Sequence, residues 1–378
     1  MLYFDHNSTT PVDSRVADAL DRANRGVFGN ASSIHLAGQS AKQMLEKSRR
    51  GVAWALGAKE AEIVFTSGGT ESNNLALRGV LSAGMHAVTT VIEHPSVLEP
   101  FRQLEREGVA VTYVAAGASG VVSADAIAAA VRPETVLVSV MMANNETGAI
   151  QPIAEIAETL RGKGILLHSD GVQAAGKMPV SVAELGVDLF SISGHKLYAP
   201  KGLGALYVRK GVKLKSMQLG GRHERGMRAG TENVAGAMAL ECALGLCSAA
   251  EQMHIADLRD EFEARILREV PDAVVNAAAA PRLSNTSNIL FPGVSGEALL
   301  IALDMAGMCV STGSACSSGS VEPSHVLLQM GLTVKQARSC IRFSFGRGNS
   351  LSDINPLVRA VSETAGKMRK SVREKQLV

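Results

Sequence analysis

The sequence predicts an α/β protein whose larger domain is built on a mostly parallel β-sheet. Six short apolar runs, rich in β-branched residues, recur between positions 62 and 193, and helix-like segments separate most of them. The runs show little polar alternation, which is typical of parallel strands that are buried on both faces of a sheet. At 378 residues, with 46% apolar and 20% charged residues, the chain is long enough for about two to three domains.

The expected elements follow one another in a regular order. A short strand at 2–4 precedes a helix at 11–24, a polar loop at 26–33 and a helix at 36–56. The predicted strands are then 62–66, 86–91, 109–114, 135–142, 164–169, 187–193 and 204–209. A glycine- and arginine-rich loop at 219–231 leads into a long helix at 232–250, which continues as a charged helix at 253–270. Residues 271–285, with their alanines and a proline, are the expected connection to a second, smaller domain.

Charge and cysteine usage exclude several classes of protein. The 38 basic and 36 acidic side chains are spread along the chain and give a net charge of +2, which does not favour a nucleic-acid or membrane surface. Five cysteines without C-x-x-C spacing argue against a disulfide framework and against a zinc site. The N-terminus lacks a signal-peptide pattern, and no stretch of about 18 apolar residues occurs. We therefore expect a cytoplasmic protein with reduced thiols, no metal and no membrane contact.

Polar residues follow one predicted strand after another. A glycine turn at 66–73 opens a helix, and the later strands are followed by His94, by 144–148, by Asp170 with Gln173, and by Lys196. Ligands of parallel α/β sheets bind outside the carboxyl ends of the strands, where these residues would gather. Each residue alone would more often be a turn residue or a helix cap.

The types of these residues are complementary for one cofactor, pyridoxal 5'-phosphate (PLP). A PLP site needs a lysine for the Schiff base, a carboxylate on the pyridine nitrogen and an anion pocket for the phosphate. Lys196 and Asp170 suit the first two roles, and the turn at 66–73 suits the third because it presents backbone N–H groups at a helix start. The sequence therefore predicts a PLP site at this edge of the sheet.

Six ordered motifs resemble those of the cysteine desulfurases of the NifS and IscS type, and the likeness runs from Tyr3 to about Arg347. The motifs are Ser-Gly-Gly-Thr-Glu-Ser-Asn-Asn from Ser67, Asn-Asn-Glu-Thr-Gly from Asn144, Ser-Gly-His-Lys-Leu-Tyr-Ala-Pro-Lys-Gly from Ser193, Arg-Ala-Gly-Thr-Glu-Asn from Arg228, Ser-Thr-Gly-Ser-Ala-Cys from Ser311 and Ile-Arg-Phe-Ser-Phe-Gly-Arg from Ile341.

The resemblance implies a homodimer of the PLP-dependent transferase fold type I, with sites at the subunit interface. In that fold a mostly parallel seven-stranded sheet is sandwiched by helices, and a smaller α+β domain follows. By similarity, residues 15–258 form the large PLP-binding domain and 259–378 form the small C-terminal domain that carries the catalytic cysteine loop. The N-terminal segment 1–14 would associate with the small domain.

The resemblance also implies a role for each site residue. Lys196 carries the cofactor, Asp170 pairs with the pyridine nitrogen, and His94 stacks on the ring. Asn145 and Gln173 contact the side of the ring hydroxyl, and Asn145 also faces the substrate. Arg342 clamps the substrate carboxylate with its planar fork. The cofactor phosphate is held by Gly69, Thr70, Ser193 and His195, joined by Thr231 of the partner subunit.

Cys316 distinguishes a desulfurase from other PLP enzymes. Its segment, 311–320, consists mainly of small residues and is expected to form a mobile loop. The implied reaction converts L-cysteine to L-alanine and leaves the sulfur on Cys316 as a persulfide, with His94 placed to handle a proton. The catalytic set is then Cys316, Lys196 and His94. The sulfur would pass to an acceptor protein, such as an iron-sulfur scaffold or a tRNA-thiolation enzyme.

Three other functions compete with this interpretation. A selenocysteine lyase would use the same site, whereas a catalytically silent sulfur carrier would not need Lys196, Asp170 and Arg342. An aminotransferase would not need Cys316.

The sequence also departs from the family pattern at Ala31, where many relatives have proline. It stops at Val378, after a basic helical segment at 368–375, without the extension by which IscS-type members dock the scaffold.

Overall fold

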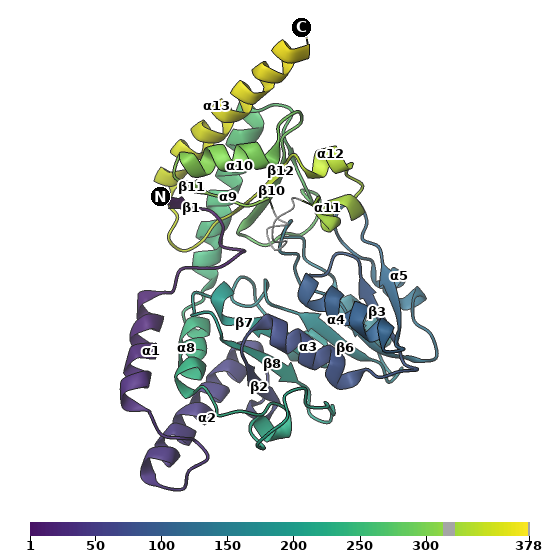
Figure 1. Ribbon diagram of the computed structural model, residues 1–378, viewed down its shortest axis with the longest axis vertical. Coiled ribbons are helices and arrows are strands. Elements are labelled where there is room, and N and C mark those ends of the chain that lie inside the picture. The colour runs from purple at the N-terminus through teal and green to yellow at the C-terminus, as the bar shows by residue number, and fades with distance from the viewer. Residues whose placement is uncertain (313–321, 377–378) are drawn as a thin grey trace.

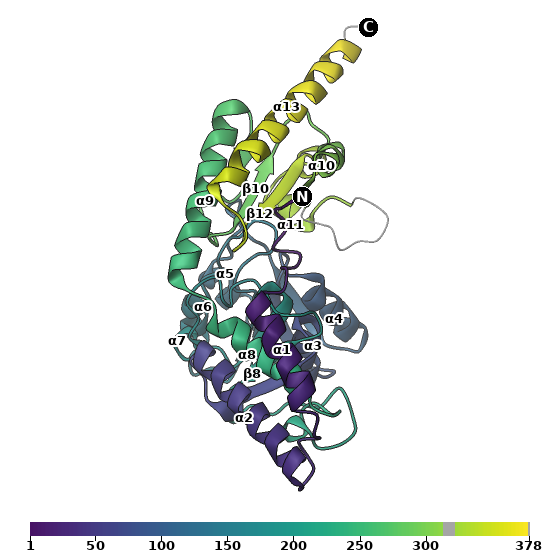
Figure 2. The same ribbon diagram turned by 90° about the vertical axis from the view of Figure 1, so that its left-hand side faces the viewer.

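The computed structural model describes residues 1–312 and 322–376, with side chains through residue 370 (Figures 1 and 2). Its larger domain contains a seven-stranded sheet in the order β2-β8-β7-β6-β5-β3-β4. Only β8 runs against its neighbours; the other neighbouring strands are parallel. The predicted α/β class with a mostly parallel sheet is confirmed. The strands are β2 (Ile63–Thr66), β3 (His86–Thr90), β4 (Ala110–Val114), β5 (Thr135–Ser139), β6 (Leu166–Asp170), β7 (Leu189–Ser193) and β8 (Gly204–Val208).

Two hydrophobic cores lie on the two faces of this sheet. Successive strand residues enter opposite cores, as Leu137 and Val138 do on β5 and Leu189 and Phe190 on β7. This alternation explains why the strands are apolar at nearly every position. One core includes residues of α2 (Leu36–Leu56), α5 (Ala124–Ala129), α6 (Ile153–Leu160), α7 (Val182–Leu185) and α8 (Val234–Gly245), and the other includes residues of α3 (Gly69–Val80) and α4 (Pro95–Arg106).

The smaller domain has a core of its own around an antiparallel sheet of order β12-β10-β9. Its strands are β9 (Val274–Val275), β10 (Thr286–Leu290) and β12 (Cys340–Ser344), and the helices against it are α9 (Ala249–Glu269), α10 (Gly296–Met305) and α13 (Leu351–Gln376). The segment 271–285 is therefore not a simple connection, because it contains β9, which pairs with β10. Shorter elements are η1 (Glu60–Glu62), η2 (Gly194–Lys196), η3 (Glu224–Gly226), α11 (His325–Gln329) and α12 (Val334–Ala337).

The long helix expected across 232–270 is two helices. It breaks between α8 and α9, where the Ser248 side chain accepts a hydrogen bond from the backbone N–H of Glu251 and so caps α9. The two helices are bent by 69° at this break. Among the described residues, no single helix is long and apolar enough to cross a membrane; only this bent pair together reaches that length and composition.

The N-terminal segment connects the two domains (Figures 1 and 2). Strand β1 (Leu2–Tyr3) pairs in parallel with β11 (Met308–Cys309), and Phe4 is buried in the core of the smaller domain. After Thr10 the chain enters α1 (Ser14–Gly26), which packs against α8 of the larger domain. Residues 5–13 therefore pass between the domains, next to the carboxyl ends of the parallel strands.

Candidate functional site

A polar cavity of about 460 Å³ lies where the carboxyl ends of the parallel strands face the smaller domain. This size is in the usual range for small-molecule sites. Ten of the predicted site residues line it: Gly69, Thr70, His94, Asn145, Asp170, Gln173, Ser193, His195, Lys196 and Arg342. Thr231 does not line it and is exposed. Cys316 lies outside the described residues.

Asp170 ends β6 and is buried at the cavity wall. One carboxylate oxygen accepts from Nδ2 of Asn73 at 2.7 Å, and the other accepts from the backbone N–H of Val172 at 2.9 Å. Asn73 is held in turn by Ser96, whose Oγ accepts from the same Nδ2 at 2.9 Å. Both partners of Asp170 are donors, so its two carboxylate oxygens are held in place at the cavity wall.

Lys196 follows β7, in the short 3-10 helix η2, and its side chain reaches the N-terminal segment. Its Nζ donates to the carbonyl oxygens of Asn7 at 2.8 Å and of Ser8 at 2.5 Å. Nearby, burial and the charge of Lys196 lower the pKa of His195 to about 4, so His195 is a neutral ring at neutral pH. Two backbone carbonyls of the N-terminal segment thus help to hold the amine of Lys196 at the cavity.

His94 caps α4 and offers only one of its ring nitrogens to the cavity. Its Nδ1 accepts from the backbone N–H of Ser96 at 3.1 Å, so a neutral ring carries its proton on Nε2. Burial lowers the pKa of His94, opposed by Asp170 and reinforced by Lys196 and His325. In the neutral ring, the nitrogen that remains available to a ligand is Nε2, which is an N–H donor.

The start of α3 provides an anion site at the other end of the cavity. Gly68 has φ of 148°, a conformation that favours glycine, and Gly69 begins the helix. A Cβ on Gly69 would lie 2.6 Å from Cγ2 of Val172, so only glycine fits there. The twelve-residue helix presents its free backbone N–H groups and the positive end of its dipole beside Thr70.

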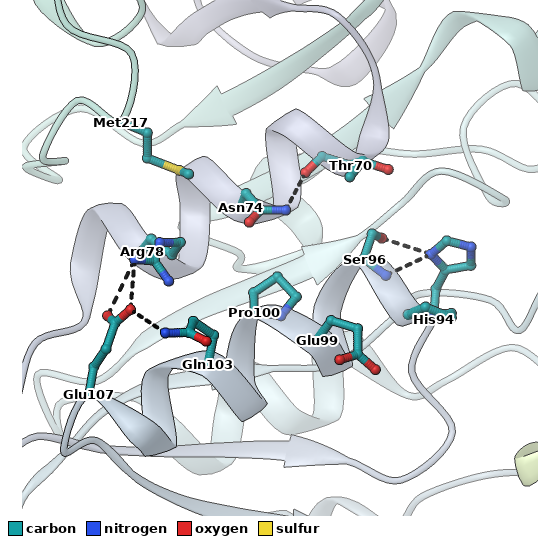
Figure 3. Close-up of a pocket in the computed structure, with 11 residues that line it drawn as sticks. Thr70, Asn74, Arg78, His94, Ser96, Glu99, Pro100, Gln103, Glu107 and Met217 are labelled. Atoms are coloured by element: carbon teal, nitrogen blue, oxygen red, sulfur yellow. Dashed lines mark hydrogen bonds and ion pairs between the residues drawn. The ribbon is translucent and has the colours of Figure 1, made fainter.

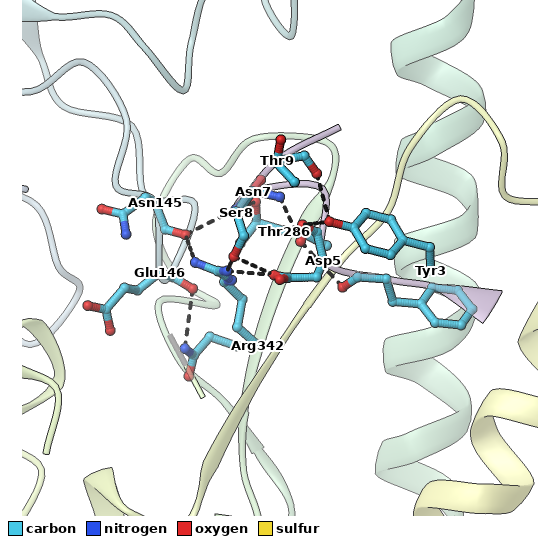
Figure 4. A network of polar contacts seen from close by, with 12 residues as sticks. Tyr3, Asp5, Asn7, Ser8, Thr9, Asn145, Glu146, Thr286 and Arg342 are labelled. Atoms are coloured by element: carbon cyan, nitrogen blue, oxygen red, sulfur yellow. Dashed lines mark hydrogen bonds and ion pairs between the residues drawn. The ribbon is translucent and has the colours of Figure 1, made fainter. Parts of the chain in front are cut away.

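Arg342 projects from β12 of the smaller domain and is almost completely buried (Figure 4). Its guanidinium is paired within the protein. Its Nη2 donates to Oδ1 of Asp5 and to Oγ of Ser8, each at 2.7 Å, and its Nη1 donates to the carbonyl oxygen of Asn145 at 2.9 Å. Nε has no hydrogen-bond partner among the described residues, so N–H capacity remains for a further acceptor.

The four described cysteines are poor thiolates. Burial raises the pKa of Cys247 to about 11 and that of Cys340 to about 12, and it also raises the pKa values of Cys242 and Cys309. The thiolate, not the thiol, is the nucleophile. At neutral pH none of these four is suited to attack sulfur.

A second hollow of about 700 Å³ lies between α3 and α4 and shares Thr70, His94 and Ser96 with the polar cavity (Figure 3). Its outer wall carries the ion pair of Arg78 with Glu107, which is partly exposed and contributes little to stability. Among the described residues its wall holds no lysine and no buried carboxylate, whereas the 460 Å³ cavity has both.

Sequence reasoning missed the contribution of the N-terminal segment. Asp5, Asn7 and Ser8 line the cavity, and Asp5 and Ser8 contact Arg342 (Figure 4). Asn7 also contacts Lys196 and Gln173. Sequence reasoning also missed Lys177, whose buried amine contacts Gln173. The only signal was a run of polar residues between a strand and a helix, which is equally typical of a connecting loop.

The fold and the site together define a class of protein. A mostly parallel sheet with a lysine, a buried aspartate and a helix N-terminus at its strand ends has the architecture of the PLP-dependent transferases of fold type I. Comparison with known proteins gives the family.

The family "Aminotransferase class-V" matches residues 2–357. A protein of Dictyoglomus turgidum named "Cysteine desulfurase IscS" is 43% identical, with 97% of this chain and 95% of that protein covered. Among solved structures, a "NIFS-LIKE PROTEIN" superposes with a TM-score of 0.89 at 34% identity, covering 97% of this chain and 99% of the other. "SspA in complex with cysteine" gives a TM-score of 0.82 at 34% identity, covering 92% and 99%. The chain belongs to the class-V aminotransferase family and, within it, to the cysteine desulfurases of the NifS and IscS type.

Proposed function

We propose that this protein is a PLP-dependent cysteine desulfurase that converts L-cysteine to L-alanine and retains the sulfur on Cys316. The observation that carries the proposal is one cavity that combines the Lys196 amine, the buried Asp170 carboxylate and the Arg342 guanidinium. The family supports the same activity, and one solved relative is described in complex with cysteine.

The residues of the cavity fit PLP. Lys196 would hold it covalently, Asp170 would hold its protonated ring nitrogen, and His94 would lie against the ring. The N-terminus of α3, with Gly69 and Thr70, would hold its phosphate together with Ser193 and His195. Bound PLP supplies an electron sink for the charge released when a bond to the α-carbon of an amino acid breaks.

The remaining residues bind the substrate and move protons. Arg342 would bind the cysteine carboxylate through N–H groups that its present partners leave available, and Asn145 would contribute beside it. The Lys196 amine would take the proton from the α-carbon, because it lines the same cavity as the groups proposed to hold the substrate. His94 would donate a proton from Nε2, the nitrogen that carries it in the neutral ring.

Cys316 is the proposed acceptor of sulfur. Its thiolate attacks the substrate sulfur, the carbon–sulfur bond breaks as the sulfur–sulfur bond forms, and the carbon takes a proton to become the methyl group of alanine. The substrate carbon is reduced and the sulfur oxidised by the same electron pair, so no external oxidant is needed. The raised pKa values of the other four thiols support Cys316 for this role.

The proposal is tested by alanine release from L-cysteine by PLP-loaded protein and by its Arg342→Ala and Arg342→Lys variants. We expect the native protein to release alanine. Loss of a charged carboxylate contact should raise KM by about 10- to 100-fold in Arg342→Ala while the cofactor absorption stays. Arg342→Lys should lie in between, because it keeps the charge but loses the fork. No alanine from native protein would reject the function; an unchanged KM in Arg342→Ala would assign the carboxylate to another group.

We further propose that the active unit is a homodimer in which Thr231 of the partner subunit completes the phosphate site. Two features support this proposal: Thr231 is exposed and outside its own cavity, and Phe28, Ile34 and Leu36 are more than four-fifths exposed on the loop after α1 and at the start of α2. Exposed apolar groups of this kind mark interaction surfaces. Sedimentation should give twice the mass of one chain, and Ile34→Asp should weaken the dimer. A fully active monomer at assay concentration would refute this proposal.

The sulfur is proposed to leave Cys316 for an acceptor protein, either an iron-sulfur scaffold or a tRNA-thiolation enzyme. With radioactive sulfur on Cys316, extract of the source cell should reveal which protein takes the label, and label recovered only as free sulfide would argue against a protein acceptor.

A further inference from the structure

Lys177 is a buried lysine that the proposed reaction does not use. It lies in the turn after β6, and only 8% of its surface is exposed. The turn directs it inward because Gly176, at φ of 73°, packs closely: a Cβ there would lie 2.5 Å from Leu197 and 2.7 Å from the sulfur of Cys247. Among the described residues Lys177 has no ion-pair partner; its Nζ donates to Oε1 of Gln173 at 2.6 Å and to Oδ1 of Asn7 at 3.0 Å. A buried lysine without a carboxylate is costly and calls for a functional reason.

The Asn7 side chain can face Lys177 in only one orientation. Its Nδ2 donates to the carbonyl oxygen of Asn145 at 3.1 Å and to Oγ1 of Thr286 at 2.8 Å. The Thr286 hydroxyl uses its own hydrogen on Oδ1 of Asn285 at 3.0 Å, so it must accept from Asn7. Oδ1 of Asn7 is thereby left to accept, and it does so from Lys177 and from Nδ2 of Asn285 at 2.8 Å.

The Gln173 amide is fixed in the same way from both ends. Its Nε2 donates to the carbonyl oxygen of Asn7 at 3.0 Å, and a carbonyl can only accept. Its Oε1 accepts from Lys177. Turning the amide over would set oxygen against oxygen at Asn7 and N–H against N–H at Lys177. Burial, with Lys196 and Arg342, lowers the pKa of Lys177, and a neutral amine could also accept. The Asn7 carbonyl can only accept, so it keeps the Gln173 amide in this orientation in either state, and in either state Lys177 has an N–H for Oε1.

We propose that Lys177 is a positioning residue that keeps Gln173 a hydrogen-bond donor toward the cavity. With Oε1 committed to Lys177 and one hydrogen of Nε2 committed to Asn7, the second hydrogen of Nε2 is what Gln173 can offer to a ligand. The same Asn7 carbonyl accepts from Lys196 at 2.8 Å, so the donor lies beside the amine proposed to hold the cofactor. The inference rests on the proposed function: the acceptor would be the ring oxygen of PLP, whose ionised form a donor stabilises.

A double-mutant cycle tests whether Lys177 acts through Gln173. The apo forms of native protein, Lys177→Met, Gln173→Leu and the double variant are titrated with PLP, and the pH midpoint of the bound-cofactor absorption is measured for each. Loss of one hydrogen bond should weaken PLP binding by about 2- to 10-fold and raise the pH midpoint. Because both residues serve one contact, the double variant should match the Gln173→Leu variant instead of adding the two losses.

Two control variants accompany the double-mutant cycle. Lys177→Gln keeps an N–H₂ donor and should stay within about twofold of native, which tests the proposal even if the Met variant does not fold. Lys201→Met, at an exposed lysine of the Lys196 loop, should change nothing. Additive losses of PLP affinity in the double variant would show that Lys177 acts through its own charge and would overturn the inference. Native-like PLP binding by Lys177→Met would also overturn it, as would a tenfold loss of PLP affinity in Lys177→Gln. Native protein that binds no PLP would refute the proposed function itself, and the inference with it.

Discussion

Replacement of Lys196 by alanine is expected to lower alanine formation from cysteine by about 10³-fold or more. The amine serves both as the covalent attachment of PLP and as the base at the α-carbon, and loss of a positioned acid or base alone costs about 10²- to 10⁴-fold. Among the described residues, His195 and His94 are weaker bases because their pKa values are lowered, and Lys177, which does not line the cavity, is bonded to Asn7 and Gln173. The measurement is the initial rate of alanine release with saturating PLP.

Lys201→Ala is the matched control, because Lys201 lies in the same loop but is exposed. It should retain the native rate. Borohydride reduction of the native protein, followed by peptide mapping, should place the pyridoxyl group on Lys196. A label on another lysine, or a Lys196→Ala variant that remains within tenfold of native, would contradict the assignment.

Replacement of Cys316 by serine is expected to separate the two halves of the reaction. Alanine and sulfide should fall to background, a loss of at least about 10²-fold, because a hydroxyl has a far higher pKa than a thiol and cannot retain sulfur as a persulfide. Binding of cysteine and removal of its α-proton depend on Lys196, Asp170 and Arg342. The variant should therefore still change its cofactor absorption when cysteine is added, and in D₂O it should still introduce deuterium at the α-carbon.

The other cysteines provide the comparison. Serine at Cys242, Cys247, Cys309 or Cys340 should leave turnover largely intact, since burial keeps each of these thiols protonated. Near-native alanine release by Cys316→Ser would reject the sulfur-transfer step. Loss of the absorption change in the same variant would show instead that the first half of the reaction needs the thiol.

The strand ends could be predicted from the sequence because they follow a simple rule. An apolar run buried on both faces ends where the sheet ends, and the next polar residues must lie at that edge, as His94, Asp170 and Lys196 do. Nine of the ten predicted residues in the cavity end or follow strands of this sheet, whereas Arg342 lies on β12 of the smaller domain and was predicted from the family resemblance. The break between α8 and α9 was missed because helical residues occur on both sides of it, and only the Ser248 cap marks the new start.

The N-terminal part of the cavity followed no such rule. The sequence around Asn7 shows no hydrophobic periodicity and no motif. The role of Asn7 depends on hydrogen bonds with residues 145, 177, 196 and 286, which are distant in the sequence. The pairing of Asp5 with Arg342 joins residues 337 positions apart. Contacts of this kind depend on how two domains dock, which local composition does not encode.

The N-terminal segment also has a consequence for synthesis of the protein. Asn7 leaves the ribosome long before its partner, because its backbone N–H donates to Oγ of Ser344, 337 residues later in the chain. At about 5 to 20 residues per second, roughly 20 to 70 s pass before that partner exists. The large domain can bury its sheet in that interval, but the cavity cannot close on its N-terminal side. We expect a nascent chain stalled before β12 to be compact but unable to retain PLP, so that the cofactor is captured only after translation of both domains.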